Sequence, residues 1–185
     1  MIFRKRPERY GGVAQFFHWA VVVLIAFQYT WAWRIDQTEG IRARFELVTQ
    51  HKTIGMLVLA FAVLRLLWRL FHAPPPLPKH LANWELWAAK MGHLALYGLI
   101  FIVPISGWLY SQAAGYGDHW WGPVVLPVFI EATEASEALF YELHELFGRL
   151  LIAVVAIHVL AALRHHFILK DNVLKRMLPQ WQQRR

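Results

Sequence analysis

The sequence predicts an all-α fold, a transmembrane four-helix bundle that forms one domain over residues 1–185. Its composition is that of a chain surrounded by lipid, because 57% of the residues are hydrophobic and ten are tryptophan, more than a soluble domain of this size usually carries. Four apolar segments each reach the roughly 20 residues that a helix needs to cross a hydrocarbon core of about 30 Å. These two observations together favour lipid over water as the solvent of this chain.

The four spans are expected at about residues 13–33, 49–70, 91–112 and 146–167. The first follows a basic stretch that resembles the start of a signal peptide. The apolar segment is too long and too aromatic for one, and it lacks a small-residue cleavage site, so we expect it to stay in the membrane. The proline-rich stretch 73–78 cannot continue a helix, which predicts a short extended connection between the second and third spans.

The third span contains Pro104 and Gly107, which predict a kink, and its helix is expected to begin earlier, around Trp84 and Trp87. Residues 113–145 form the remaining long connection. The acidic second half of this loop, around residues 131–137, is expected to be helical and to lead directly into the fourth span.

Most lysines and arginines fall on one side of the membrane, the side shared by the two termini and the proline connection. The positive-inside rule makes this side cytoplasmic, so both termini are expected in the cytoplasm and the loop 113–145 outside. The formal charge of +7 does not indicate nucleic acid as a partner. The basic residues flank apolar runs and form no stripe with interleaved aromatic residues.

Two histidines, His144 and His158, lie within the most apolar part of the chain, fourteen residues apart. On a helix this spacing separates them by roughly 21 Å and brings them to within about 40° of one another, so one helix face presents an imidazole in each leaflet. Ionisable groups inside a span are costly and usually functional. At the depth of His144 the expected partner is His51, whereas His158 can meet either His18 or His93.

Histidine pairs stacked across a bilayer suit two b-type haems, each iron taking one imidazole from either side. Gly55 and Gly148 lie one turn beyond His51 and His144, which would leave room for a porphyrin. A single histidine in a span is as often only an interhelical hydrogen-bonding group. Other metal chemistry is disfavoured, since there is no His-Glu-x-x-His motif for zinc, and the absence of cysteine excludes covalent haem attachment.

The motifs of the chain resemble those of the bacterial cytochrome b561 family over nearly the whole length. The matching residues are Phe17-His18-Trp19, Gln50-His51-Lys52-x-x-Gly55, Met91-Gly92-His93-x-x-x-Tyr97, Pro104-Ile105-Ser106-Gly107, Ala156-Ile157-His158, Ala162 to Phe167, and Lys170-Asp171-Asn172-x-x-x-Arg176-Met177-Leu178-Pro179. The resemblance implies a multi-pass inner-membrane protein with two haems b, bound by the pairs His18/His158 and His51/His144. His93 would then lie beside a ligand or near a quinone.

An iron with two imidazole ligands favours electron transfer over oxygen binding, because all of its positions are filled. With irons roughly 20 Å apart, we expect electrons to cross the membrane to ubiquinone. Candidates for the quinone and its protons are Lys79, His93 and His165, although His165 and His166 could equally form a solvated cap of the helix end. Lys52 and Arg149 could neutralise haem propionates, while Arg149 could equally pair with Glu145.

The electron donor on the outer side is left open by the sequence. Some members of the family it resembles are superoxide oxidases, which makes a superoxide:ubiquinone oxidoreductase one expectation. Acidic residues outnumber basic ones on this side, which disfavours steering of a small anion and favours docking of a basic periplasmic redox protein. The alternative is a non-catalytic haem-containing anchor subunit that relays electrons for such a partner.

Overall fold

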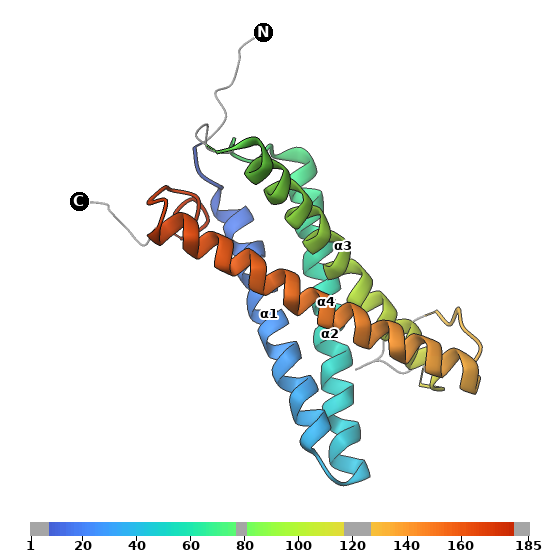
Figure 1. The fold of residues 1–185 in the computed structure, drawn as a ribbon. Coiled ribbons are helices and arrows are strands. Elements are labelled where there is room, and N and C mark those ends of the chain that lie inside the picture. Colours follow the sequence, from blue (N-terminus) through green and yellow to red (C-terminus); the bar gives the residue numbers. More distant parts are fainter. Residues whose placement is uncertain (1–7, 77–80, 117–126, 180–185) are drawn as a thin grey trace.

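The computed structural model describes residues 8–76, 81–116 and 127–179, and within them the regular secondary structure is entirely α-helical (Figure 1). The four helices are α1 (Gly12–Gln37), α2 (Ile41–Phe71), α3 (Asn83–Ala113) and α4 (Glu134–Phe167). Each is long and apolar enough to cross a membrane. The predicted fold class, a transmembrane bundle of four helices, is therefore confirmed.

The helices extend beyond the predicted spans, chiefly on the side away from the termini. The longest extension is at α4, which begins at Glu134, so the acidic part of the preceding loop is helical and leads directly into the span, as expected. The Thr133 side chain accepts a hydrogen bond from the Ser136 N–H at 3.1 Å, and the first turn carries Glu134 and Glu137, both of which favour a helix start. Helix α3 begins at Asn83 and continues through Pro104.

Backbone contact between the helices follows the order of the chain. Helices α1 and α2, α2 and α3, and α3 and α4 each pack closely, whereas no Cα atom of α4 lies within 8 Å of a Cα atom of α1 or α2. Helix α4 crosses in front of these two helices. The α1–α2 pair and the α3–α4 pair diverge toward the ends that lie away from the termini (Figure 1). The buried core around Val21, Val58, Ile100 and Leu151 is correspondingly small, and large apolar side chains such as Ile157 face outward, as suits lipid.

The C-terminal segment, residues 168–179, closes the end of the bundle at which both termini lie. The Trp19 Nε1–H donates to the Met177 carbonyl at 2.9 Å, and the buried Gln15 Nε2 donates to the Arg176 carbonyl at 3.2 Å. From the same turn, the Arg176 guanidinium donates to the Pro76 carbonyl at 2.6 Å. The segment is thereby joined both to α1 and to the connection between α2 and α3. We refer to this end as the terminal end and to the opposite one as the far end.

At the far end, Gln112 fastens the loop that leads to α4. Its side chain is only 2% exposed; Nε2 donates to the Pro127 carbonyl at 2.8 Å, and Oε1 accepts the Phe129 N–H at 2.8 Å. A buried amide that is satisfied at both its oxygen and its nitrogen is a stable anchor. The predicted loop positions between 117 and 126 lie outside the described residues.

Candidate functional site

The first histidine pair lies toward the far end, where His51 of α2 meets His144 of α4. The two ring centroids are 6.2 Å apart and the ring planes are nearly perpendicular, at 88°. One metal ion between two imidazoles, with bonds of about 2.0 Å each as in zinc sites, separates ring centroids by roughly 6 Å. The pairing expected from depth alone is therefore present, at a spacing that one ion can bridge.

Helix α3 holds the His144 ring in place. Its Nδ1 lies 3.1 Å from the Val103 carbonyl oxygen and 3.2 Å from the Ser106 hydroxyl oxygen. A Cβ atom added at Gly107 would lie 2.8 Å from Cε1 of the ring, so only glycine leaves this space. Donation from Nδ1–H to a carbonyl fixes the tautomer that leaves Nε2 free for a metal. The sequence predicted only a kink at Gly107 and no role for Ser106, although both lie in the Pro104-Ile105-Ser106-Gly107 motif.

A second histidine cluster lies toward the terminal end. The rings of His93 and His158 are 5.4 Å apart, and His18 is close enough to interact electrostatically with both. All three histidines therefore gather at one depth, as expected, and ring proximity does not by itself select one partner for His158.

Helix spacing separates the two candidate partners of His158. A porphyrin stands between its two axial ligands and needs the ligand-bearing helices well apart. His93 and His158 lie on α3 and α4, whose backbones pack closely, whereas His18 lies on α1, which makes no close backbone contact with α4. The same holds for His51 and His144, since α2 and α4 are also apart.

The buried imidazole nitrogens fit a ligand that is not a protein group. Nδ1 of His18 and Nδ1 of His51 are buried and have no hydrogen-bond partner among the described residues. Buried polar atoms are normally paired, and an interhelical hydrogen-bonding role, the plain alternative for a histidine in a span, is not served by these atoms. Two imidazole pairs with free nitrogens, on helices held apart, form a donor set suited to haem iron.

The two glycines expected beside the histidines differ in their surroundings. A Cβ atom at Gly55 would lie 3.0 Å from Nε2 of Gln28, and this amide donates to the His51 carbonyl at 3.0 Å. Gly55 thus admits Gln28 and leaves no open space. At Gly148 a Cβ atom would meet nothing within 4 Å, while its carbonyl accepts a hydrogen bond from the Tyr29 hydroxyl. Tyr29 therefore reaches across the wider separation between α1 and α4.

Basic side chains lie near both histidine clusters. Arg65 and Arg69 lie over the Tyr97 ring at 5.5 and 5.0 Å, and Arg65 acts electrostatically on the histidines toward the terminal end. Neither arginine pairs with a carboxylate within the described ranges, so both are available for the acidic groups of a cofactor. From the sequence alone, these two arginines indicated only the orientation of the chain in the membrane.

Near the far end, Lys52 donates to the Tyr116 carbonyl at 3.1 Å. Arg149 forms the alternative contact considered for it, an ion pair with Glu145 at 2.7 Å, and its side chain is 78% exposed. Lys52, the neighbour of His51 in the sequence, thus contacts the end of the loop that follows α3, while Arg149 is engaged at the surface.

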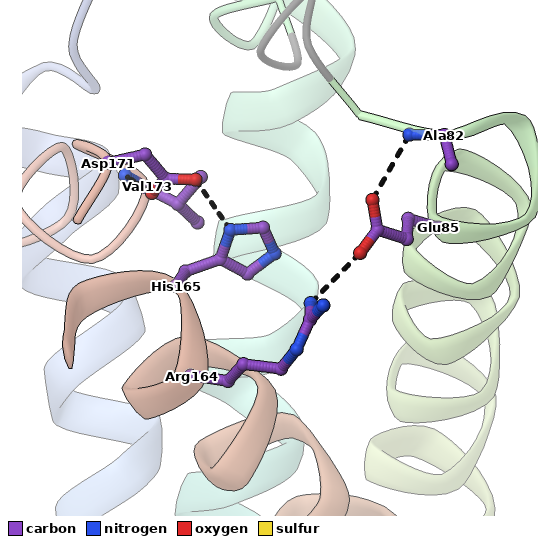
Figure 2. Close-up of polar contacts among 6 residues, drawn as sticks. All are labelled: Ala82, Glu85, Arg164, His165, Asp171 and Val173. Atoms are coloured by element: carbon purple, nitrogen blue, oxygen red, sulfur yellow. Dashed lines mark hydrogen bonds and ion pairs between the residues drawn. The ribbon is translucent and has the colours of Figure 1, made fainter. Parts of the chain in front are cut away.

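At the terminal end, His165 is not a solvated cap. Its Nδ1 lies 2.6 Å from Asp171 Oδ2 in the C-terminal segment (Figure 2), a partner that the sequence analysis quoted in a motif without a role. Nδ1 of His166 is buried and has no hydrogen-bond partner among the described residues.

Tyr10 lies at the same end of the bundle, just before α1. Burial raises the pKa of its phenol, which therefore stays protonated at neutral pH. Lys79 lies outside the described residues.

Four membrane-spanning helices with paired histidines inside their apolar spans define a membrane protein of the haem-binding, electron-transferring class. The chain belongs to the prokaryotic cytochrome b561 family, whose family model matches residues 9–180. Membership implies b-type haem and electron transfer in the membrane, and it suggests the bacterial inner membrane as the location.

Relatives from enterobacteria match over almost their full length. The chain is 35% identical to cytochrome b561 homolog 2 of Escherichia coli (strain K12), over 96% of this chain and 95% of that protein. It is 28% identical to the probable superoxide oxidase CybB of Yersinia pestis, over 88% and 92% respectively. Cytochrome b561 homolog 1 of Escherichia coli is 26% identical, over 94% and 98%.

Proposed function

We propose that this protein is a di-haem cytochrome that transfers electrons across the inner membrane, between a donor at the far end and ubiquinone at the terminal end. His51 and His144 hold one haem b, and His18 and His158 hold the other. The observation that supports these pairs most strongly is helix spacing. Each proposed histidine pair joins two helices that make no close backbone contact, α2 with α4 and α1 with α4.

The protein contributes orientation and charge at each site. The Val103 carbonyl and Gly107 fix the His144 ring, and Lys52 lies beside the pair that this ring forms with His51. Arg65 and Arg69 supply positive charge near the other pair. Bound haem supplies one-electron transfer, and an iron with two imidazole ligands has no free position for oxygen. Because its sites lie in opposite leaflets, the chain can carry charge across the bilayer.

The terminal end offers the groups that quinone reduction needs. Ubiquinone is a lipid-phase carrier that takes up protons when reduced, and His165, His93 and Lys79 are the candidate residues. His165 follows His158 by seven residues. It therefore lies on nearly the same face of α4, roughly 10 Å nearer the helix end. With both termini in the cytoplasm, as the distribution of lysine and arginine favours, the protons come from the cytoplasmic side.

Two kinds of donor are distinguished by the charge at the far end. Superoxide is one, since a 28% identical relative is named as a probable superoxide oxidase. Described acidic residues outnumber basic ones there, and Arg42 and Arg149 are engaged by Glu46 and Glu145. This charge pattern favours a basic periplasmic redox protein, for which the chain would act as a membrane anchor and electron relay. Stopped-flow mixing of oxidised protein with superoxide separates the two, because haem reduction by superoxide requires no partner.

The ligand set is tested with alanine variants of single histidines in purified protein. We expect His51→Ala and His144→Ala to remove one low-spin haem signal, His18→Ala and His158→Ala to remove the other, and His93→Ala to retain both. The measurements are the haem to protein ratio and the low-spin signals in electron paramagnetic resonance. Loss of a haem in His93→Ala with retention in His18→Ala would reverse the second assignment, and haem-free protein from haem-replete cells would refute the function.

A further inference from the structure

A partly buried contact between a histidine and an aspartate joins the last turn of α4 to the C-terminal segment (Figure 2). His165 Nδ1 lies 2.6 Å from Asp171 Oδ2, and the two side chains are only 16% and 7% exposed. The second carboxylate oxygen, Oδ1, accepts the Val173 N–H at 2.9 Å. Asp171 is therefore fixed at both oxygens, and it presents one of them to the imidazole.

The backbone after α4 is built to return Asp171 to His165. The Leu169 N–H donates to the Arg164 carbonyl at 3.0 Å, and Lys170 adopts a left-handed conformation with φ of 53°. The Asp171 N–H then donates to the His165 carbonyl at 3.1 Å. His165 is thus held twice by one residue, through its own carbonyl oxygen and through its ring.

A second ion pair at the same end already joins the helix ends. Arg164 of α4 lies 2.9 Å from Glu85 of α3, and Glu85 also accepts the Ala82 N–H at the start of α3 (Figure 2). These are the charged groups that neighbour His165 on α3 and α4. Arg164 and Glu85 join α4 to α3, whereas His165 and Asp171 join α4 to the C-terminal segment.

We propose that Asp171 positions the imidazole of His165, and that His165 donates a proton to ubiquinone at the terminal end. A carboxylate at Nδ1 keeps a proton on that nitrogen and orients the ring. Nε2–H is then the donor that remains for a ligand. The proposal rests on the proposed function, because it requires a quinone at this end of the bundle.

The proton and electron balance is that of quinone reduction. The quinone ring takes two electrons from the far-side donor, and each carbonyl oxygen gains one proton to become a hydroxyl. His165 gives the proton on Nε2 to one quinone oxygen, while the proton on Nδ1 stays on the ring and remains hydrogen-bonded to Asp171. The ring then regains a proton at Nε2 from water at the terminal end. The other oxygen takes its proton from the same water.

The test uses haem-loaded, full-length protein that has been reduced and is then mixed with ubiquinone-1 in a stopped-flow instrument. Asp171→Asn preserves the size of the side chain but loses its charge, and its amide can turn an N–H toward Nδ1 and favour the wrong tautomer. We expect the maximal rate of haem reoxidation to fall about 10–100-fold, as for a misplaced general acid. The half-saturating ubiquinone-1 concentration and the haem spectrum should stay close to those of the parent protein.

Glu85→Gln is the matched control, because it neutralises the other paired carboxylate at this end and should leave the rate within about threefold of the parent. Asp171→Glu, which keeps the charge, should recover most of the lost rate. The double variant Asp171→Asn/His165→Gln should be no slower than His165→Gln alone, since Asp171 acts through the imidazole. If Asp171→Asn loses haem, Asp171→Glu and His165→Gln carry the comparison.

The outcomes separate the two ideas. Parent protein whose haems are not reoxidised by ubiquinone-1 refutes the proposed function. Parent protein that reacts, with Asp171→Asn equally fast or with additive losses in the double variant, leaves the function standing and overturns the role of Asp171.

Discussion

At the scale of single residues, Gly107 decides where the His144 ring lies. The ring occupies the space that any other side chain at this position would fill, and its Nδ1 reaches the Val103 carbonyl of the same helix. Groups that orient a metal-bound histidine commonly contribute about 10–100-fold to metal affinity. Gly107 is therefore part of the proposed far-end haem site together with His144.

Gly107→Ala is expected to push the ring away from Val103 and to lower occupancy of the far-end haem about tenfold or more. Gly98→Ala on the same helix is the control, since a Cβ atom there meets nothing within 4 Å. The haem to protein ratio after growth at limiting haem measures the effect. Equal haem content in both variants would show that the ring finds another position.

At the scale of elements, the C-terminal segment depends on α1 for its position. Gln15 is buried, and its Nε2 donates to the carbonyls of Tyr10 and Arg176. These acceptors lie on either side of the junction between the start of α1 and the segment that carries Asp171. The position of the His165 partner is thus set by a hydrogen bond made on a different helix.

Gln15→Met keeps the size of the side chain but leaves both carbonyls without this donor, at a cost of about 1–3 kcal/mol. We expect faster tryptic cleavage after Lys175 and Arg176 and slower haem reoxidation by ubiquinone-1. Gln50→Met is the control, because Gln50 bonds to Trp31 on an exposed face at the far end. Cleavage at the same rate in both variants would show that the segment is held without Gln15.

At the scale of the whole molecule, the orientation in the membrane determines which solution supplies protons. The chain contains no cysteine, so single cysteines can be introduced without a background. We expect Glu39→Cys at the far end to react with a membrane-impermeant maleimide in intact cells, and Asn172→Cys in the C-terminal segment to react only after lysis. Both positions are exposed. The reverse pattern would place the termini outside and exchange the two faces.

Predictions from periodicity and depth succeeded where a single helix contains the information. The fourteen-residue spacing of His144 and His158 predicted one shared face, and matching depths predicted that His51 lies near His144 and that His18 or His93 lies near His158. The rings of His51 and His144, and those of His93 and His158, do lie close together, while the choice of haem ligands stays a prediction. The start of α3 near Trp84 was also confirmed. The acidic residues around 131–137 were expected to be helical and to lead into the fourth span, and this is confirmed, because α4 begins at Glu134 with Thr133 as its cap.

The sequence by itself determined the four spans, the depth of each histidine and the family, because hydropathy and helical periodicity are properties of one segment at a time. Only the tertiary structure decided which helices stand apart: α1, which carries His18, makes no close backbone contact with α4, whereas α3, which carries His93, packs closely against it. It alone showed that Gln28 fills the space at Gly55 and that Asp171 returns to His165. Such contacts join residues distant in the chain, and their distances depend on how whole helices pack.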